Sequence, residues 1–149
     1  MLLAKNKKAY YNYEIIDKFL AGVVLKGYEV KACREKKINL EAAFVKVTPE
    51  GIFLVNMDIG RYSKQSQPGE DNKRIRKLLV TGAEQEKIER ELNQKGKTAV
   101  PLAVLLKSNM IKVEIAIVKG KKAAGKKQTL KERQIKRDME KEVKSHSVV

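Results

Sequence analysis

The strongest constraint on the fold is a run of strict alternation near residue 110. The odd positions from 111 to 117 are all Ile or Val, whereas Lys112 and Glu114 lie between them. A period of two is typical of a β-strand with one face in a core and the other toward solvent. An apolar run at 100–106 and a polar turn at 107–109 precede it. The two segments therefore predict a β-hairpin.

Other segments also predict strands. A Pro/Gly turn at 48–51 separates apolar runs at 44–47 and 52–55, which indicates a second hairpin. The alternation of Tyr11, Tyr13 and Ile15 with polar residues predicts a strand near the N-terminus, and an apolar run at 78–80 predicts another. The polar segment 60–73 has no periodicity and reads as a mobile loop.

Two helices are predicted between the strands. The longer one covers Glu84 to Lys95, with a capping box at Thr81 and Glu84 and a stop at Gly96. The shorter one covers about Glu29 to Lys36 and places Cys33 on its apolar side. Several short strands with helices over an opening predict a mainly β protein with flanking helices, an OB-like small closed β-barrel.

The chain of 149 residues, 42% of them hydrophobic, is long enough for one domain core. Charge divides it near residue 118. Residues 119–149 hold 11 Lys and Arg against 4 Asp and Glu, and they contain no aromatic residue and no Pro. Such a segment buries too little surface to offset its ordering entropy. We therefore predict a barrel over 1–118 and a basic tail over 119–149 that is disordered when free and helical when bound.

The charge balance predicts a polyanionic partner. There are 33 Lys and Arg against 18 Asp and Glu, a net charge of +15, which favours nucleic acid first and an anionic membrane surface second. The longest apolar run, 99–106, is far shorter than the roughly 20 residues of a spanning helix. The N-terminus turns basic within five residues, the reverse of a secretory signal. We expect a cytoplasmic protein without a membrane partner.

The sequence offers little support for catalysis. Cys33 is the only cysteine and His146 the only histidine, so a multi-cysteine metal site and histidine-based chemistry are both poorly supported. Gly120-Lys121-Lys122 lacks the preceding glycine and the Ser or Thr of a phosphate-binding loop. We predict a protein that is not an enzyme, with no catalytic residue, metal or cofactor, and we expect a monomer.

Three basic clusters favour RNA as the partner. They lie at 5–8, 73–77 and 119–127. The first stands beside Tyr10, Tyr11 and Tyr13, and lysine can neutralise phosphate while tyrosine stacks on an unpaired base. Tyr11 and Tyr13 could equally be core residues of a strand, so both interpretations stay open.

Six short motifs carry a family resemblance that runs collinearly over about residues 6–133. They are Asn6-Lys7-Lys8-Ala9; Gly27-Tyr28-Glu29-Val30-Lys31; Asn56-Met57 with Ile59 and Tyr62; Arg74-Ile75-Arg76-Lys77-Leu78-Leu79; Val100-Pro101-Leu102; and Lys119-Gly120-Lys121-Lys122. Together they resemble the SmpB family, small protein B, the partner of transfer-messenger RNA in bacterial ribosome rescue.

The resemblance implies an OB-like barrel that acts as an RNA-binding adaptor of trans-translation. It would bind the tRNA-like domain of transfer-messenger RNA and deliver it to stalled ribosomes. The C-terminal tail would enter the empty message channel as a helix. The alternative is a general ribosome-associated RNA-binding OB-fold protein without a rescue function.

The resemblance also implies the residues that contact RNA. At the family's positions these are Asn6, Lys7, Lys8, Glu29, Lys31, Leu79, Lys112, Gly120, Lys121 and Lys122. The basic motif before Leu79 adds Arg74, Arg76 and Lys77. The residues expected to bind the ribosome through the tail are Lys126, Lys127, Lys131, Arg133, Lys136 and Arg137.

Six positions depart from the family pattern. Tyr10 and Tyr11 replace Arg-His, Leu20 replaces a glutamate, Ala32 replaces a serine, Asp58 replaces a histidine, and Gly125 replaces an acidic residue at the start of the tail. These departures concern the detailed RNA contacts more than the fold. The sequence therefore predicts a divergent member of the family.

Overall fold

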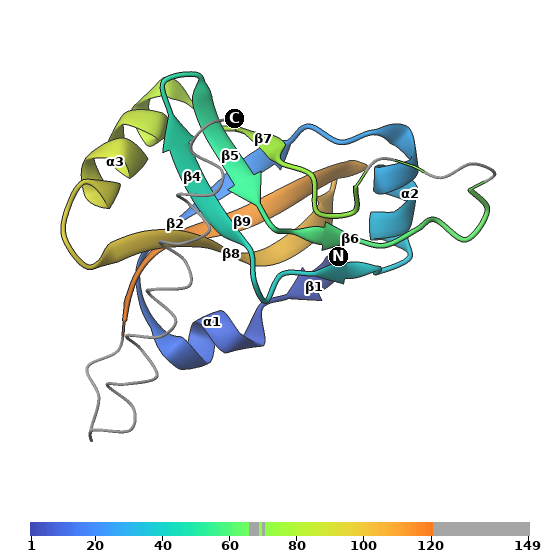
Figure 1. Cartoon of the computed structure of the whole chain (residues 1–149), viewed down its shortest axis with the longest axis horizontal. Coiled ribbons are helices and arrows are strands. Elements are labelled where there is room, and N and C mark those ends of the chain that lie inside the picture. The colour runs from blue at the N-terminus through green and yellow to red at the C-terminus, as the bar shows by residue number, and fades with distance from the viewer. Residues whose placement is uncertain (66–68, 70, 121–149) are drawn as a thin grey trace.

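A computed structural model describes residues 1–65, 69 and 71–120. These residues form a seven-stranded antiparallel sheet, a small two-stranded sheet and three helices (Figure 1). The large sheet has the order β1-β8-β9-β2-β7-β5-β4, and β3 pairs with β6. The strands are β1 (Leu2–Lys5), β2 (Tyr13–Val23), β3 (Ile38–Asn39), β4 (Phe44–Thr48), β5 (Gly51–Val55), β6 (Asp58–Ile59), β7 (Arg76–Leu79), β8 (Lys97–Lys107) and β9 (Met110–Gly120). The helices are α1 (Lys7–Asn12), α2 (Gly27–Arg34) and α3 (Gly82–Leu92).

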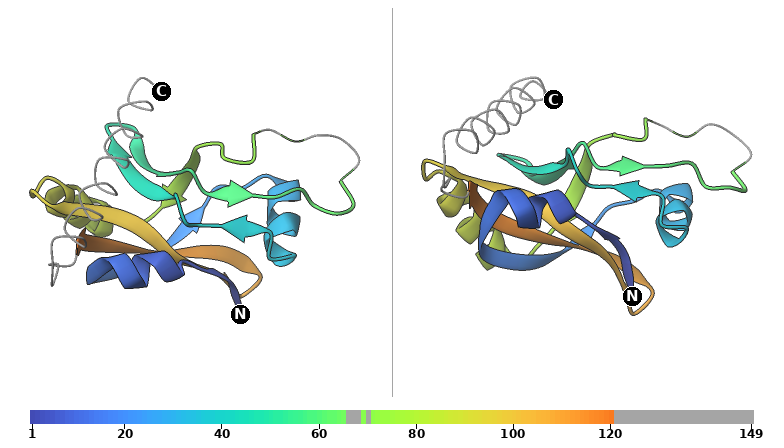
Figure 2. Two further views of the ribbon diagram at one scale, coloured as in Figure 1. Left: turned by 60° about the horizontal axis from the view of Figure 1, so that its bottom comes forward. Right: turned by 90° about the horizontal axis from the view of Figure 1, so that it is seen from below.

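The large sheet curls until its last strand lies over its second. β4 packs against β8 (Figure 2). Phe44 of β4 joins Val100 and Leu102 of β8 in one buried cluster. Among the described residues, no backbone pairing joins the edge strands β1 and β4. The predicted mainly β fold with flanking helices is confirmed. Where the two ends of the sheet meet, packed side chains of β4 and β8 hold them together, rather than hydrogen bonds between strands.

Both predicted hairpins are confirmed. In the β8–β9 hairpin, Ser108 and Asn109 have φ values of 51° and 63°, and two central residues with positive φ make the kind of turn that matches the twist of the flanking strands. Pro101 lies within β8, where the pairing with β9 shifts register between Pro101 and Ala103. A register shift is where a strand tolerates proline.

The predicted strand over Tyr11 and Tyr13 is wrong in its first half. Residues 7–12 form α1 instead, because the Asn6 side chain accepts the Ala9 N–H at 3.2 Å and caps the helix. β2 begins only at Tyr13. The capping geometry thus prevails over a short alternating pattern, and the segment before it forms β1, an additional strand.

The two predicted helices are confirmed with shifted ends. α3 has its capping box at Thr81 and Glu84, buries Ile88, and ends at Leu92, short of the predicted Lys95. α2 begins at Gly27, two residues before the prediction, and the Glu29 carboxylate accepts the Lys26 N–H at 2.8 Å. This contact closes the first turn of α2.

The interior of the curled sheet is apolar. Its largest cluster includes Phe19, Leu54, Ile115 and Ile117, with Cys33 of α2 among them. Burial raises the pKa of the Cys33 thiol to about 12, so this cysteine packs as a small apolar side chain, as predicted.

The last described strand extends past the predicted domain boundary. β9 continues to Gly120, which pairs with Tyr13. β9 therefore runs at least two residues past 118, and the tail predictions from residue 121 onward lie outside the described residues. Within the described chain, the helices are too short and too polar to cross a membrane.

Candidate nucleic-acid interface

Three neighbouring strands bring a leucine, a glycine and a lysine into one row on the outer side of the sheet. Gly22 of β2 pairs with Leu79 of β7 on one side and with Lys112 of β9 on the other. A Cβ built on Gly22 would lie 3.4 Å from the Leu79 Cβ and 3.7 Å from the Lys112 Nζ. The predicted RNA-contact residues Leu79 and Lys112 are therefore close neighbours, and only Gly22, which has no side chain, lies between them in the sheet.

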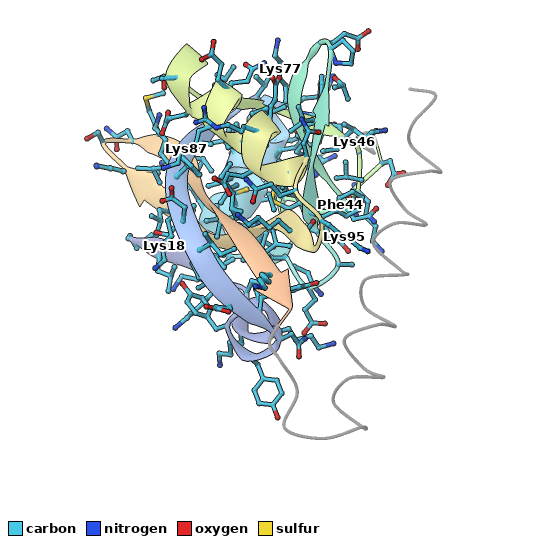
Figure 3. All side chains as sticks on the ribbon, turned by 90° about the vertical axis from the view of Figure 1, so that its left-hand side faces the viewer. Lys18, Phe44, Lys46, Lys77, Lys87 and Lys95 are labelled. Atoms are coloured by element: carbon cyan, nitrogen blue, oxygen red, sulfur yellow. The ribbon has the colours of Figure 1, made fainter. Side chains whose placement is uncertain are left out.

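Further charged and apolar side chains surround this row, which we call the three-strand face. Lys77 stands two residues before Leu79, on the same side of β7. Leu20 is opposite Glu114, and Glu114 pairs with Lys18 at 3.9 Å. Figure 3 shows Lys18 and Lys77 on the outside of the molecule. The face combines exposed cations with an exposed leucine, and Leu79 is 53% exposed. Glu114 places a carboxylate directly across from the position where the family's glutamate is replaced by Leu20.

Behind the three-strand face lies a buried ionic network. Arg76 is 0% exposed, and its Nε and Nη2 donate to the Glu29 Oε2 at 2.8 and 2.6 Å. Its remaining donors reach the backbone oxygens of Met57, Asn72 and Arg74. A guanidinium that is buried without water must be satisfied by protein acceptors, and this one is.

Arg74 completes the network from its rim. Its Nε donates to both Glu29 oxygens, and its Nη2 lies 2.5 Å from the Oε1. Burial alone would raise the pKa of Glu29, but the hydrogen bonds from Arg74, the Lys26 backbone and Arg76 outweigh it and hold the pKa below its ordinary value. Glu29 therefore carries its charge inside the protein at neutral pH.

The network changes the interpretation of two predicted contact residues. Glu29 is 3% exposed and Arg76 is fully buried, so neither side chain presents a group to a ligand on the surface. Each has a structural task instead, since the two side chains tie α2 to β7. In this structure Glu29 and Arg76 support the three-strand face from behind rather than form part of it.

The N-terminal cluster is also divided between interior and surface. Asn6 is buried and donates to the backbone oxygens of Leu40 and Pro101 at 3.2 and 2.9 Å. Lys7 and Lys8 are exposed on the first turn of α1. Asn6 therefore anchors the segment that presents the two lysines.

The tyrosines next to this cluster differ in the same way. Tyr13 is buried, and burial raises its pKa to about 12, which agrees with the core interpretation. Tyr11 is 69% exposed on α1. The Tyr10 ring has Lys5 at 5.1 Å and Lys18 at 5.9 Å from its centroid, as cation–π contacts.

The other predicted residues fall in three places. Lys31 lies on the exposed side of α2, with its Nζ 5.4 Å from the centre of the Tyr62 ring. Gly120 ends β9. The remaining predicted contact residues lie outside the described part of the chain: Lys121, Lys122, Lys126, Lys127, Lys131, Arg133, Lys136 and Arg137.

Sequence reasoning missed Gly22, and the strand register is what identifies it. In the sequence, nothing distinguishes a glycine that follows an alanine near the end of a strand. In the structure, its pairing with both Leu79 and Lys112 identifies Gly22 as part of the site.

Over residues 1–65, 69 and 71–120, no three His, Cys, Asp or Glu side chains come together as a metal site.

Fold and site together define a small mainly β protein with a cationic, partly apolar outer face. The family profile described as SmpB protein matches residues 3–145. The chain therefore belongs to the SmpB family, and the predicted resemblance is confirmed.

Similar proteins span nearly the whole chain. The SsrA-binding protein of Coprothermobacter proteolyticus is 43% identical over 145 residues, covering 96% of this chain and 97% of its own. The SsrA-binding protein of Treponema denticola is 39% identical over 143 residues, covering 96% and 93%. A solved structure reported as "tmRNA-SmpB: a journey to the center of the bacterial ribosome" has a TM-score of 0.70 and 31% identity, over 91% of this chain and 95% of that chain.

Proposed function

We propose that the protein is an RNA-binding adaptor of trans-translation that binds the tRNA-like domain of transfer-messenger RNA and delivers it to stalled ribosomes. Relatives named for binding SsrA, and the similar structure of SmpB with tmRNA, support the proposal. The observation that carries it is the three-strand face, where Leu79 and Lys112 meet over Gly22.

The chemistry of the face suits a structured RNA. The Lys112 ammonium and the nearby Lys77 can neutralise phosphates, while the exposed Leu79 offers apolar contact to a sugar or an unpaired base. Gly22 carries no side chain, so the Leu79 side chain and the Lys112 ammonium can lie directly over its buried backbone and face an RNA together. Lys7, Lys8, Lys31 and Arg74 add charge around the same domain.

The tail has a separate role in this proposal. Residues from 121 onward enter the empty message channel of the ribosome, with Lys126, Lys127, Lys131, Arg133, Lys136 and Arg137 against ribosomal RNA. The protein acts as a monomeric adaptor rather than an enzyme, in the cytoplasm with the ribosomes that it serves. Truncation after Gly120 should leave a barrel that melts cooperatively and binds RNA but does not support tagging of stalled chains. Loss of the cooperative melt would show that barrel and tail are not independent.

One alternative has an observation in its favour. The charge of +15 gives affinity for any RNA, and the family's glutamate is replaced by Leu20, so a general ribosome-associated RNA-binding protein would have the same surface.

The test is a paired titration of the full chain against the tRNA-like domain of transfer-messenger RNA and an elongator tRNA. Both RNAs should bind at low salt, because phosphate contacts dominate there. A preference for the tRNA-like domain that persists at physiological salt supports the adaptor. Equal, salt-sensitive affinities for both RNAs would favour the general RNA-binding protein.

A further inference from the structure

A row of three side chains crosses β4, β5 and β7, which lie side by side in the large sheet (Figure 1). Phe53 of β5 pairs with Lys46 of β4 on one side and with Lys77 of β7 on the other. Directly paired residues of neighbouring strands point to the same side of a sheet, so the phenylalanine lies between the two lysines. We call these three residues the lysine–phenylalanine row.

Phe53 differs from the other phenylalanines of the chain. The sequence contains three, and Phe19 and Phe44 each belong to one of the two buried clusters. Phe53 is only partly buried, and among the described residues it belongs to neither cluster. Its neighbours along β5, Ile52 and Leu54, fill the core instead. An aromatic ring therefore remains on the outer side of the strand and contributes nothing to the apolar interior.

Cross-strand packing does not account for this ring. Aromatic residues stabilise a sheet through aromatic or β-branched partners, whereas both partners of Phe53 are lysines. None of the cation–π contacts in the described part of the chain involves this ring. The Lys77 stem passes over Gly51, since a Cβ built on that glycine would lie 3.5 Å from the Lys77 Cε. Gly51 stands two residues before Phe53 on the same side of β5, so it leaves room for the lysine stem beside the ring.

The row continues into the three-strand face. Lys77 and Leu79 point to the same side of β7, and Leu79 pairs with Gly22. Phe53 is opposite Lys77, so Leu79 is its diagonal neighbour, at roughly 7–8 Å. Nucleotides along one strand rise about 3.4 Å each when stacked. An RNA strand that contacts Leu79 therefore reaches Phe53 within a few nucleotides.

The composition of the row selects the kind of partner. RNA-binding sheets present aromatic rings on which unpaired bases stack, and nearby cations bind the phosphates beside those bases. A paired base is enclosed within its duplex, so only an unpaired base can reach such a ring. A protein partner fits less well, because lysine is depleted at the centres of protein interfaces and Phe53 has a lysine on both sides.

We propose that Phe53 stacks on one unpaired base of the tRNA-like domain, while Lys46 and Lys77 contact the phosphates next to that base. The inference rests on the proposed function for the identity of the RNA, and it adds a residue that distinguishes unpaired from paired bases. Charge alone cannot make this distinction, because paired and unpaired RNA both carry phosphates. Phe53 thereby favours a loop over a stem.

The first test compares Phe53→Ile and Phe53→Tyr in the full chain. Isoleucine keeps an apolar side chain that suits a strand but has no ring, whereas tyrosine keeps the ring. The isoleucine variant should bind the isolated tRNA-like domain about 5- to 100-fold more weakly, the range expected for one stacked base. The tyrosine variant should bind within about twofold of the parent chain. Both variants should melt within about 4 °C of the parent chain, which excludes a merely structural role.

The salt dependence of binding separates stacking from charge. Loss of the ring removes no phosphate contact, so Phe53→Ile should leave the slope of log affinity against log salt unchanged. Lys46→Ala should lower the same slope by about 1. An equal change of slope in both variants would mean that the row acts through charge alone, and the stacking contact would be rejected.

A second test reports on stacking without relying on affinity. The chain contains no tryptophan, so Phe53→Trp introduces a single indole into the row. The tRNA-like domain should quench its fluorescence by about half or more, whereas a fully paired RNA duplex should bind at low salt with little quenching. The control is Leu2→Trp, a 47% exposed position beside the N-terminus. That terminus lies on the opposite side of the molecule from the β4–β5 hairpin in both views of Figure 2. The control emission should change by less than about a tenth with either RNA.

Several outcomes would overturn the inference. One is an unchanged affinity of Phe53→Ile for the tRNA-like domain, and another is equal quenching of the two indoles. Equal quenching by the duplex would show that the ring meets no unpaired base. Quenching by vacant ribosomes but not by the tRNA-like domain would assign the ring to ribosomal RNA. If the parent chain shows no preference for the tRNA-like domain over an elongator tRNA, the proposed function fails, whereas the comparison with the duplex still decides whether Phe53 stacks on a base.

Discussion

The two sides of β7 use the same kinds of residue for opposite purposes. Arg76 and Leu78 point inward, where the arginine is buried against Glu29 and the leucine joins the core. Lys77 and Leu79 point outward, where they form part of the three-strand face. Four consecutive residues therefore supply one cation and one leucine to the fold and another such pair to the surface.

The comparison shows that charge in a basic cluster does not by itself identify a binding residue. The alternation of a strand decides which cations are available, and a buried cation is retained only with its acceptors. The difference between the inner and outer sides of β7 can be tested by stability on one side and by RNA affinity on the other.

The largest effect is expected for Glu29→Ala. It leaves Arg76 buried without its carboxylate and removes the partner of Arg74, so the free energy of unfolding should fall by about 3–5 kcal/mol. Denaturant unfolding followed by circular dichroism measures this. Lys77→Ala serves as the control on the outer side and should change stability by less than about 0.5 kcal/mol. A loss below about 1 kcal/mol for Glu29→Ala would show that the network does not hold α2 to β7.

The same network predicts a dependence of stability on pH. The pKa of Glu29 is held below its ordinary value in the folded protein, so its stabilising contribution is complete above the unfolded-state pKa of about 4.3. The contribution is lost as the pH falls through the lower folded-state pKa. The Glu29→Gln variant should therefore lose less stability than the parent chain between pH 5 and pH 2. Parallel acid-unfolding curves for the two proteins would contradict the assignment.

On the outer side, Lys112→Ala should leave the fold intact and weaken binding of the tRNA-like domain. The expected loss is about 1–3 kcal/mol if the ammonium meets a phosphate in an ordered contact. Fluorescence anisotropy measures the affinity, and the melting temperature of the variant is the control. An unchanged affinity would remove Lys112 from the proposed interface.

The smallest effect is expected for Glu114→Gln. Its ion pair with Lys18 spans 3.9 Å between partly exposed side chains, so stability should change by less than about 0.5 kcal/mol. Loss of a negative charge next to Lys112 should strengthen RNA binding by about twofold. A weaker affinity would mean that the Glu114 carboxylate itself accepts a hydrogen bond from the RNA, as a replacement for the missing acid at Leu20.

The sequence predicted those parts of the structure that depend on local patterns. The alternation at 111–117 and the capping box of Thr81 and Glu84 each correspond to an observed element, because each is determined by contacts within a few residues. The α1 helix was missed because its cap depends on Asn6, a residue whose side chain is fixed by the distant Leu40 and Pro101.

The candidate site was predictable only in part, for a related reason. Leu79 and Lys112 were assigned through the family pattern, but their closeness on either side of Gly22 follows from pairing between strands that are far apart in the chain. The buried state of Arg76 likewise depends on Glu29, 47 residues away, so no pattern within the basic cluster distinguishes it from Lys77. The end of α2 and the segment after β6 are likewise joined by Glu35 and Ser63, 28 residues apart.

The position of β1 also has a consequence for the order of events during synthesis. β1 pairs with β8, where Leu2 lies opposite Leu105, and Asn6 bonds Pro101, 95 residues later. Among the described strands, β1 precedes all others in the chain and must therefore wait for β8, which comes next to last. At about 5–20 residues per second, the delay is on the order of 5 to 20 seconds. The N-terminal segment, with its capping residue Asn6 and two exposed lysines, can take its place on the sheet only after β8 has been synthesised.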